Sequence, residues 1–387
     1  MTIQELLDLV VQKDASDLHL VVGSPPTVRV SGTLLFVGSE PLTQQTAENL
    51  IFALLTPQQK DQFQVNRELD FGYQYADKGR FRINVYYQRD HPSAALRLIH
   101  SIIKTPEELK LPQIVHSFAK LKQGFVLVTG PTGHGKSSTL AAIIEEINRS
   151  RAEHIVTIED PVEYFVKGVN QSQINPEVGL TFATGLRSIL RQDPNIIMVG
   201  EVRDAETAEL VIHAGLTGHL VLTTLHTKDS FGALPRLIDM GIEPFLIAST
   251  LNAVSAQRLV RKICASCKET TTVAPELEAQ VRHELANIPP FHVRELGLDL
   301  TNAGPLTFSR GKGCTRCQQT GYKGRTVISE FLVNTPTLQG IINDGCKIEP
   351  VLKEFRRQGM ITLKEDGLLR ALEGVTSLEE VLRVINE

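Results

Sequence analysis

The sequence predicts a mixed α/β protein in which a small α+β domain precedes a larger domain with a mainly parallel sheet. Three observations lead to this fold class. In the first hundred residues, apolar and polar residues alternate as in a strand with one buried face. After residue 113, short unbroken apolar runs are separated by amphipathic helical segments, a pattern typical of strands buried on both faces. Past residue 262 this pattern ends and two cysteine pairs appear.

Composition excludes several classes of protein. With 387 residues, of which 42% are hydrophobic and 22% charged, the chain can bury a sizeable core and is not disordered as a whole. Its net charge of −4 excludes a strongly basic nucleic-acid binder, but not a local basic patch. No apolar run approaches the roughly 18 residues of a membrane span, and the amino terminus carries acids where a secretory signal needs a basic leader. We therefore expect a cytosolic chain without a transmembrane segment.

The first domain is expected at residues 1–104. Its opening helix is indicated by apolar residues at helical spacing, namely Ile3, Leu6, Leu7 and Val10. The segment 81–87 alternates between apolar and polar residues and predicts a strand, with 95–99 as its neighbour. The residues from Thr105 to Glu108 mark a boundary and a helix start, so we expect a linker at 105–112.

The second domain is expected at residues 113–387. Four apolar runs predict its buried strands: Phe125–Val128, Ile155–Ile158, Ile196–Val199 and Leu220–Leu222. A cysteine-containing subdomain is expected at 262–330. A small helical end follows at 335–387, where leucines recur at helical spacing.

A glycine-rich loop between the first of these strands and an amphipathic helix matches the pattern G-x-x-x-x-G-K-[ST]. Its glycines allow backbone N–H groups to surround phosphates, and the helix presents its positive amino end. The lysine can reach the β- and γ-phosphates, and the serine hydroxyl of Ser137 can ligate Mg²⁺. We expect ATP to be bound by Gly130, Pro131, Thr132, Gly133, His134, Gly135, Lys136, Ser137 and Ser138.

Acidic residues follow two of the other strands. Glu201 comes after 196–199, whereas Glu159, Asp160 and Glu163 come at or after the end of 155–158. Because neighbouring strands of such a sheet end on the same side, both groups are expected to reach one phosphate. Repulsion among the carboxylates predicts a cation between them. By spacing alone, a solvated glutamate after a core strand explains Glu201 equally well.

At this point the chain resembles a known family. Four ordered motifs look like the Asp box, Walker B and His box regions of the secretion ATPases, namely Thr157–Glu163, Leu190–Pro194, Val199–Asp204 and Thr217–Thr227. That GspE/PulE/PilT-like superfamily drives type IV pili, type II secretion and competence pili. The resemblance covers nearly the whole chain. It implies a hexameric ring of RecA-like P-loop ATPase domains, each with a PAS-like amino-terminal domain.

The resemblance also implies roles for individual residues. Glu163 becomes the general base for the attacking water, and Glu201 lies on the magnesium side. His219 senses the γ-phosphate, and His226 supports it. Glu159 belongs to the nucleotide-binding set.

Arg82 and Arg97 each stand on the polar side of a strand pattern. From the pattern alone, each is a surface strand residue. The resemblance implies instead that both reach the nucleotide across a domain or subunit boundary. A guanidinium suits that role because it is always charged and binds phosphate oxygens in a fork.

His134 departs from the family, which usually has serine at this position of the loop. We hypothesise that protonation of its ring strengthens nucleotide binding at mildly acidic pH, because the added charge would lie near phosphate.

The cysteines form two C-x₂-C pairs and one single residue. Each pair offers two thiolates on a tight turn, so the two pairs together predict a structural, tetrahedral zinc site. Redox chemistry and unligated thiols are the alternatives, and disulfides are disfavoured in a reducing cytosol. The expected zinc ligands are Cys264, Cys267, Cys314 and Cys317, whereas Cys346 is expected to be a small buried hydrophobic residue.

Features of two branches of the family are combined here. The zinc module and the segment 357–367 resemble pilus-extension and type II secretion ATPases, whereas 15–20 and 22–29 resemble the retraction ATPases. We expect an ATP-hydrolysing motor that retracts a type IV pilus in twitching motility, with pilus extension or type II secretion assembly as the alternative. The expected partners are further copies in a homo-hexamer and an inner-membrane pilus platform protein at the cytoplasmic face of the membrane.

Two rival functions remain at the level of sequence. A RecA-like DNA-processing ATPase would use a basic cluster near the cysteines, made up of Arg258, Arg261, Lys262, Lys268, Arg310, Lys312, Arg316, Lys323 and Arg325. No aromatic stacking platform accompanies this cluster, which favours a solvated face or a subunit contact over nucleic acid. A non-hydrolysing scaffold is disfavoured by the intact set of Lys136, Glu163, Glu201 and His219.

Overall fold

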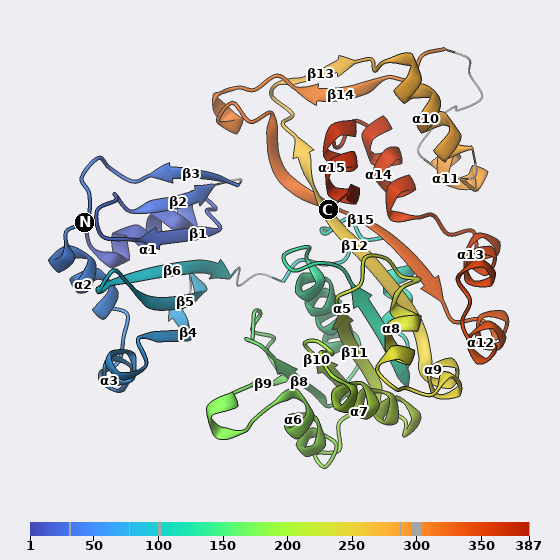
Figure 1. Ribbon diagram of the computed structural model, residues 1–387, viewed down its shortest axis with the longest axis horizontal. Helices are drawn as coiled ribbons and strands as arrows, with labels where there is room; N and C mark the ends of the chain where they lie inside the picture. Colours follow the sequence, from blue (N-terminus) through green and yellow to red (C-terminus); the bar gives the residue numbers. More distant parts are fainter. Residues whose placement is uncertain (31, 77, 100–102, 287, 296–303, 387) are drawn as a thin grey trace. The chain divides into compact units, whose positions relative to one another are not determined.

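The computed structural model describes residues 1–30, 32–76, 78–99, 103–286, 288–295 and 304–386. The chain divides into two compact units, Met1–Ile102 and Ile103–Glu387. Each unit is described by itself, and Figure 1 labels most of the elements of both.

The amino-terminal unit contains a six-stranded antiparallel sheet with the order β3-β2-β1-β6-β5-β4. Its strands are β1 (Asp17–Leu20), β2 (Thr27–Val30), β3 (Thr33–Phe36), β4 (Glu68–Tyr75), β5 (Gly79–Gln88) and β6 (His91–Ile99). Its helices are α1 (Ile3–Gln12), α2 (Gln44–Phe52) and α3 (Pro57–Asn66). The predicted α+β architecture is confirmed.

Alternation along β5 builds the core of this unit. Phe81, Ile83 and Val85 are fully buried, and the apolar stripe of α1 belongs to the same hydrophobic cluster. The intervening residues Arg82 and Asn84 are only half-buried, on the opposite face of the sheet. Since successive side chains of a strand point to opposite faces, this sheet has one apolar and one polar face.

The second unit is built on a seven-stranded sheet with the order β15-β12-β7-β11-β10-β8-β9. All pairs are parallel except β12 with β15, which is antiparallel. The strands are β7 (Gly124–Thr129), β8 (Ile155–Glu159), β9 (Asn170–Gln173), β10 (Ile196–Val199), β11 (Leu220–Leu225), β12 (Leu251–Ile263) and β15 (Tyr322–Val333). All four apolar runs of the sequence are strands of this sheet, which confirms the predicted parallel architecture.

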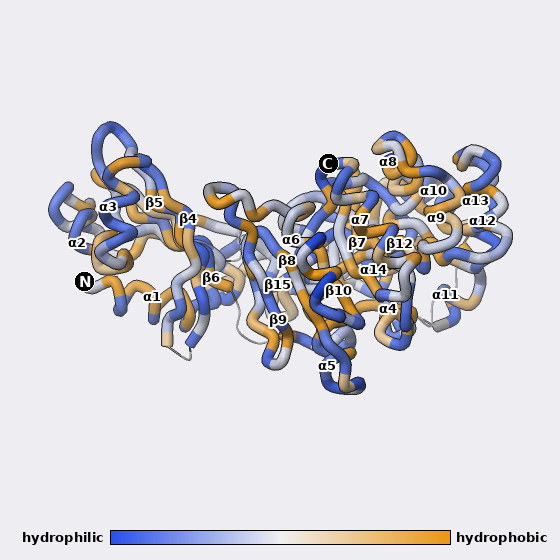
Figure 2. The backbone as a smooth tube through the Cα atoms, turned by 90° about the horizontal axis from the view of Figure 1, so that it is seen from below, coloured by the Kyte–Doolittle hydropathy of each residue, from blue (hydrophilic) through white to orange (hydrophobic). Residues whose placement is uncertain are grey.

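The central strands are buried on both faces. In β7, Phe125 and Leu127 join one hydrophobic cluster, whereas Val126 and Val128 join another on the opposite face. Figure 2 shows hydrophobic colouring along these central strands and hydrophilic colouring on outer turns. The surrounding elements are α4 (Ile114–Phe118), α5 (Lys136–Ser150), α6 (Phe182–Ile189), α7 (Ala205–Leu216), α8 (Ala233–Asp239), α9 (Pro244–Thr250) and the short η1 (Pro176–Val178).

The sheet pattern is expected to end past residue 262, and this expectation misses one strand of the sheet. β12 extends to Ile263, and β15 joins the sheet at 322–333. Neither strand is an unbroken apolar run, because each carries buried polar residues such as Gln257 and Glu330. These residues hydrogen-bond to loops and helix ends elsewhere in the fold. Because polar residues interrupt the apolar runs, a search for hydrophobic patterns does not detect these two strands.

The cysteine-containing segment and the carboxy-terminal helices complete the second unit. The first comprises β13 (Lys268–Thr271), α10 (Pro275–Leu285), α11 (Pro290–Glu295), β14 (Phe308–Gly311) and η2 (Thr315–Cys317). The second comprises α12 (Pro336–Asn343), α13 (Ile348–Arg357), α14 (Leu363–Leu372) and α15 (Leu378–Asn386), as the leucine spacing predicted for the final helices. Among the described residues, no helix has both the length and the apolar character needed to cross a membrane.

Candidate functional site

The predicted phosphate loop connects the end of β7 to the start of α5. Gly130, Gly133 and Gly135 have φ values of 143°, 81° and 83°, so they occupy the positive-φ region that glycine adopts without strain. Gly135 is the residue before the first turn of α5 and has no side chain that could cap it. The first N–H groups of a helix have no partners within the helix, so this loop offers backbone donors to an anion.

Lys136, the first residue of α5, is buried at the base of this loop. Its Nζ donates to the carbonyl oxygens of Gly130 at 2.7 Å and Pro131 at 3.0 Å. Burial lowers the pKa of Lys136 from 10.5 to about 8, although the nearby charges of Glu201 and Glu163 favour the ammonium form. The ammonium group therefore lies close to both carboxylates, in a site that penalises charge until an anion arrives.

The strand ends meet the loop at one edge of the sheet. β8, β10, β11 and β7 are paired in parallel, in neighbouring positions. Glu159 is the last residue of β8, Glu201 follows β10, and His226 follows β11. Because the carboxyl ends of parallel strands share one edge, these side chains gather beside the loop after β7. The juxtaposition expected from the sequence is therefore present.

Glu201 is held by two cationic or polar partners. Its Oε1 lies 2.5 Å from Nη2 of Arg203, and its Oε2 lies 3.1 Å from Nε2 of His226. Arg203 also reaches Asp160, at 3.3 Å. Burial acts to raise the pKa of Glu201, but the hydrogen bonds from Arg203 and His226 hold it below its ordinary value. Within the protein itself, Arg203 thus supplies the cation that carboxylate repulsion predicted.

Glu159 differs from Glu201 in its environment. It is buried and accepts hydrogen bonds from Thr157 at 2.7 Å and Gln171 at 3.0 Å. Burial raises the pKa of Glu159, and the backbone N–H of Glu163 also donates to it. Glu159 therefore shapes the loop that carries the half-buried Glu163. This arrangement favours a positioning role for Glu159 over direct contact with a nucleotide.

His219 lies away from the phosphate loop of its own chain, so its predicted contact with a γ-phosphate stays a prediction that this loop does not support. His219 precedes β11, and its carbonyl accepts from the N–H of Gly124 at the start of β7. Its Nδ1 lies 3.0 Å from the carbonyl oxygen of Ala214. The phosphate loop lies at the other end of these strands, roughly 20 Å away at a rise of about 3.3 Å per residue. The sequence contained the signal for this difference, because the predicted strand 220–222 lies between His219 and His226 and separates them along the sheet. Of the two histidines, His226 is the one that contacts Glu201.

The serines and the histidine of the loop take different positions. Ser137 is half-buried in the first turn of α5, and Ser138 Oγ lies 2.6 Å from the hydroxyl of Tyr164. The Nδ1 of His134 accepts a hydrogen bond of 3.0 Å from the backbone N–H of Leu259 in β12. A proton on Nδ1 would replace this acceptor with a donor and break the bond. The geometry thus argues against His134 protonation as a simple aid to nucleotide binding.

Arg82 and Arg97 lie on the polar face of the amino-terminal sheet, directly opposite each other on β5 and β6. Arg82 binds Asp70 through Nε and Nη2, and Arg97 Nε lies 3.0 Å from Oδ1 of the buried Asp17. The side chain of Arg97 is 68% exposed despite this anchor. Both guanidinium groups are therefore oriented by a carboxylate and still accessible, and their contact with a nucleotide stays a prediction.

Sequence reasoning assigned no role at this site to three residues that contact the phosphate loop or the carboxylates beside it. Arg203 lies within the motif 199–204, and its ion pair with Glu201 was foreseeable only from the fold. Gln257 and Arg258 lie in β12 and are buried, with 1% and 5% of their surfaces exposed. Two consecutive polar residues within the otherwise largely apolar stretch 253–260 are the signal in the sequence that could have identified them.

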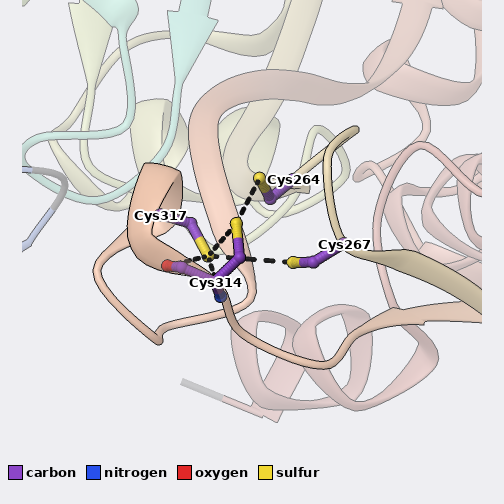
Figure 3. Close-up of side chains that lie close together, drawn as sticks. All are labelled: Cys264, Cys267, Cys314 and Cys317. Atoms are coloured by element: carbon purple, nitrogen blue, oxygen red, sulfur yellow. Dashed lines mark hydrogen bonds between the residues drawn. The ribbon is translucent and has the colours of Figure 1, made fainter.

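The four predicted zinc ligands converge (Figure 3). Their sulfur atoms all lie within 4.8 Å of one another, with Sγ–Sγ distances of 3.9 Å for Cys264–Cys314, 3.8 Å for Cys267–Cys317 and 3.6 Å for Cys314–Cys317. Four thiolates about 2.3 Å from one tetrahedral zinc ion would lie about 3.8 Å apart. A disulfide needs about 2.05 Å. The donor set therefore fits zinc and does not fit disulfides, and Cys346 is buried elsewhere, as expected.

Part of the basic cluster near the cysteines is paired with carboxylates or buried. Arg310 and Lys312 both bind Glu269, and Arg261 binds the buried Glu380. Arg258 is buried. A surface that grips phosphates needs available cations, so this pairing weakens the nucleic-acid alternative.

The comparisons with known proteins agree with this fold and site. Residues 92–383 match the family described as type II/IV secretion system protein, so the chain belongs to that family. It is 47% identical over 264 residues to the type II secretion system protein E of Pseudomonas aeruginosa, covering 68% of this chain and 49% of that protein. It is 44% identical over 295 residues to the type IV pilus assembly ATPase PilB of Thermus thermophilus, covering 75% of this chain and 31% of PilB.

A solved structure of the pilus retraction motor PilT with bound ADP is similar over 99% of this chain and 96% of that chain, with a TM-score of 0.76 and 29% identity. The chain spans about half the length, or less, of the curated relatives named above, whereas it matches PilT nearly from end to end. The family and these neighbours are secretion and pilus ATPases.

The lowered pKa of Lys136 predicts a pH-dependent nucleotide affinity. Phosphate binds the ammonium form of Lys136. Above about pH 8 the free lysine is mostly neutral and must take up a proton when phosphate binds, so the affinity for nucleotide should fall as pH rises through that value. Titration with a fluorescent ATP analogue from about pH 7 to about pH 9.5 measures this. Lys136→Arg stays charged throughout and should show no such slope, even where it binds more weakly. Parallel pH profiles for the two proteins would contradict the prediction.

Loss of one cysteine of the cluster should release the metal and destabilise the fold. Structural zinc contributes free energy on the order of 10 kcal/mol in small domains. Cys314→Ser should therefore lose zinc, measured by elemental analysis, and unfold at a lower temperature. Cys346→Ala, outside the cluster, should keep its zinc. Purified wild-type protein that is free of zinc and melts at the same temperature after zinc addition would contradict the assignment.

Proposed function

We propose that this chain is the ATP-hydrolysing subunit of a motor that works on a type IV pilus or a type II secretion filament. The observation that carries the proposal is the convergence of the phosphate loop, Glu201, Glu163 and His226 at one edge of a parallel sheet. Family membership supports it. Phosphoryl transfer to water requires positioning and charge neutralisation, which this set of residues is suited to provide.

In this proposal each group has one task. Lys136 exchanges the carbonyls of Gly130 and Pro131 for phosphate oxygens. Ser137 and Glu201 would hold Mg²⁺, a hard cation that suits an ionised carboxylate and a hydroxyl, and bound Mg²⁺ neutralises charge on the phosphates. Glu163 accepts the proton of the attacking water. His226, and not His219, responds to nucleotide binding at this edge of the sheet, through its contact with Glu201.

Arg203 bears on how this site would be switched on. In this structure, Arg203 forms ion pairs with both Glu201 and Asp160. A guanidinium and Mg²⁺ compete for the same carboxylate oxygens. Nucleotide binding in the proposed mechanism therefore releases Arg203 from Glu201.

We extend the proposal to the whole machine in the terms the family suggests. The subunits form a homo-hexamer, and Arg82 and Arg97 of the amino-terminal unit act on nucleotide across a domain or subunit boundary. Hydrolysis would then be coupled to a change in how units meet. The cysteine cluster holds structural zinc. The ring acts on an inner-membrane platform protein from the cytoplasmic face.

Retraction is the direction we propose, because the likeness to PilT extends over nearly the whole of both chains. Extension or secretion assembly is the second candidate. It is favoured by the higher identity, 44–47%, to the type II secretion protein E and PilB over the part of the chain that matches them. ATP hydrolysis is common to both.

Substituting Glu163 by Gln tests the hydrolytic proposal. The amide keeps the shape of the side chain but cannot accept the proton, so turnover should fall about 10²- to 10⁴-fold, while affinity for ATP stays within about twofold of wild type. Phosphate release and nucleotide titration measure the two quantities. Glu209→Gln, an exposed change on α7, is the matched control and should leave both unchanged. Normal turnover by Glu163→Gln would contradict the assigned role.

The same substitution in the cell tests the direction. Cells with Glu163→Gln should keep surface filaments but fail to withdraw them, as seen by microscopy of labelled filaments. Absence of filaments would contradict retraction and support the extension alternative.

A further inference from the structure

The phosphate loop is attached on one side to β12, a strand that no nucleotide motif includes. β7 pairs with β12 only as far as Thr129, opposite Ala256. Beyond that point β12 continues to Ile263, and the phosphate loop takes the place of a neighbouring strand. The N–H of Leu259 donates to the ring of His134, and the carbonyl oxygen of Gln257 faces Gly130. A Cβ on Gly130 would lie 2.6 Å from that oxygen, which explains why this position is glycine.

The side chain of Gln257 makes two further contacts, one to each side of the loop–helix junction. Its Nε2 donates to the carbonyl oxygen of His134 at 2.8 Å, and its Oε1 accepts from the hydroxyl of Thr139 in α5 at 2.8 Å. Gln257 is 1% exposed and Thr139 is 4% exposed, so water does not compete for these bonds. A carbonyl oxygen can only accept, so the amide nitrogen must face His134 and the amide oxygen must face Thr139. The orientation of the carboxamide is therefore determined by its partners.

This orientation has a consequence for the backbone donors of the loop. The C=O of His134 and the N–H of Gly135 belong to one planar trans peptide and point in opposite directions. When Gln257 holds the carbonyl toward β12, the N–H of Gly135 points away from β12. Thr132 and Gly133 are exposed on the accessible part of the loop. Backbone N–H groups turned away from the strand are the donors that phosphate oxygens require.

We propose that Gln257 is a positioning residue of the nucleotide site, which fixes the phosphate loop in its anion-binding shape through Thr139 and the carbonyl of His134. The inference rests on the proposed function, since it assigns a role within the same nucleotide site. Gln257 does not touch the nucleotide. It prevents the peptide between residues 134 and 135 from adopting other orientations. ATP binding then does not have to offset the entropy cost of ordering the loop.

The test compares affinities for a fluorescent ATP analogue with Mg²⁺, measured on the full chain. Gln257→Met keeps the volume but loses both hydrogen bonds and leaves the His134 carbonyl without its donor, so affinity should fall by about tenfold or more. Thr139→Val, which removes the other anchor of the carboxamide, should weaken binding several-fold, and Thr139→Ser should restore it. The double variant should bind no more weakly than Gln257→Met alone, because Thr139 acts through Gln257.

Gln358→Met is the matched control. Gln358, at the end of α13, also uses both ends of its carboxamide to bind backbone groups, but its partner lies in β15. Its oxygen accepts from the N–H of Val333 at 3.1 Å, and its nitrogen donates to the carbonyl of Val333 at 2.9 Å. This variant should unfold at a lower temperature without a change in nucleotide affinity. It separates a general loss of stability from a specific loss of loop positioning.

Three outcomes would overturn the inference while leaving the proposed nucleotide site in place. The first is wild-type affinity in Gln257→Met while Lys136→Ala has lost binding. The second, decisive if Gln257→Met does not fold, is wild-type affinity in Thr139→Val. The third is additive losses in the double variant. Normal binding by Lys136→Ala would overturn the proposed nucleotide site itself, and the role of Gln257 with it, so the two failures are distinguishable.

Discussion

The parallel alignment of β7, β11, β10 and β8 is the constraint on which the candidate site depends. It brings the loop before Lys136, the carboxylate of Glu201 and the ring of His226 to one edge, although they are far apart in the sequence. The same alignment sends His219 to the opposite edge. The two histidines of one motif therefore lie at opposite ends of β11: His226 lies beside the candidate nucleotide site, and His219 lies far from it.

Buried polar residues at the β12–β15 side of the sheet hold the surrounding loops in place. Glu330 of β15 accepts from the N–H of Ser230 at 2.6 Å and from that of Leu363 at 2.9 Å, so one carboxylate joins the loop after β11 to the first turn of α14. Burial raises the pKa of Glu330. Gln257 does the equivalent for the phosphate loop. β12 and β15 therefore belong to the sheet and also fix nearby loops through hydrogen bonds from buried polar side chains. Apolar side chains could not make these hydrogen bonds.

The sequence was sufficient wherever one physical rule determined the outcome. Unbroken apolar runs identified β7, β8, β10 and β11, and two C-x₂-C pairs identified four sulfur atoms that converge. It was insufficient where tertiary contacts decide. β12 and β15 carry polar residues that only neighbouring loops explain, and the pairing of Arg203 with Glu201 appears only when two strand ends meet. For His219, the resemblance to the family suggested a role at the phosphate, although the predicted strand after it already placed it at the other end of the sheet from the loop.

A crystal structure of the full chain with a non-hydrolysable ATP analogue and Mg²⁺ is the most direct measurement of the central claim. The phosphates should accept hydrogen bonds of about 3 Å from the N–H groups between Gly133 and Lys136. Nζ of Lys136 should have left the carbonyl of Gly130, and the carboxylate of Glu201 should have exchanged Arg203 for the metal. An analogue bound away from this loop, or Glu163 and Glu201 directed away from its phosphates, would contradict the assignment of this edge as the site of ATP hydrolysis.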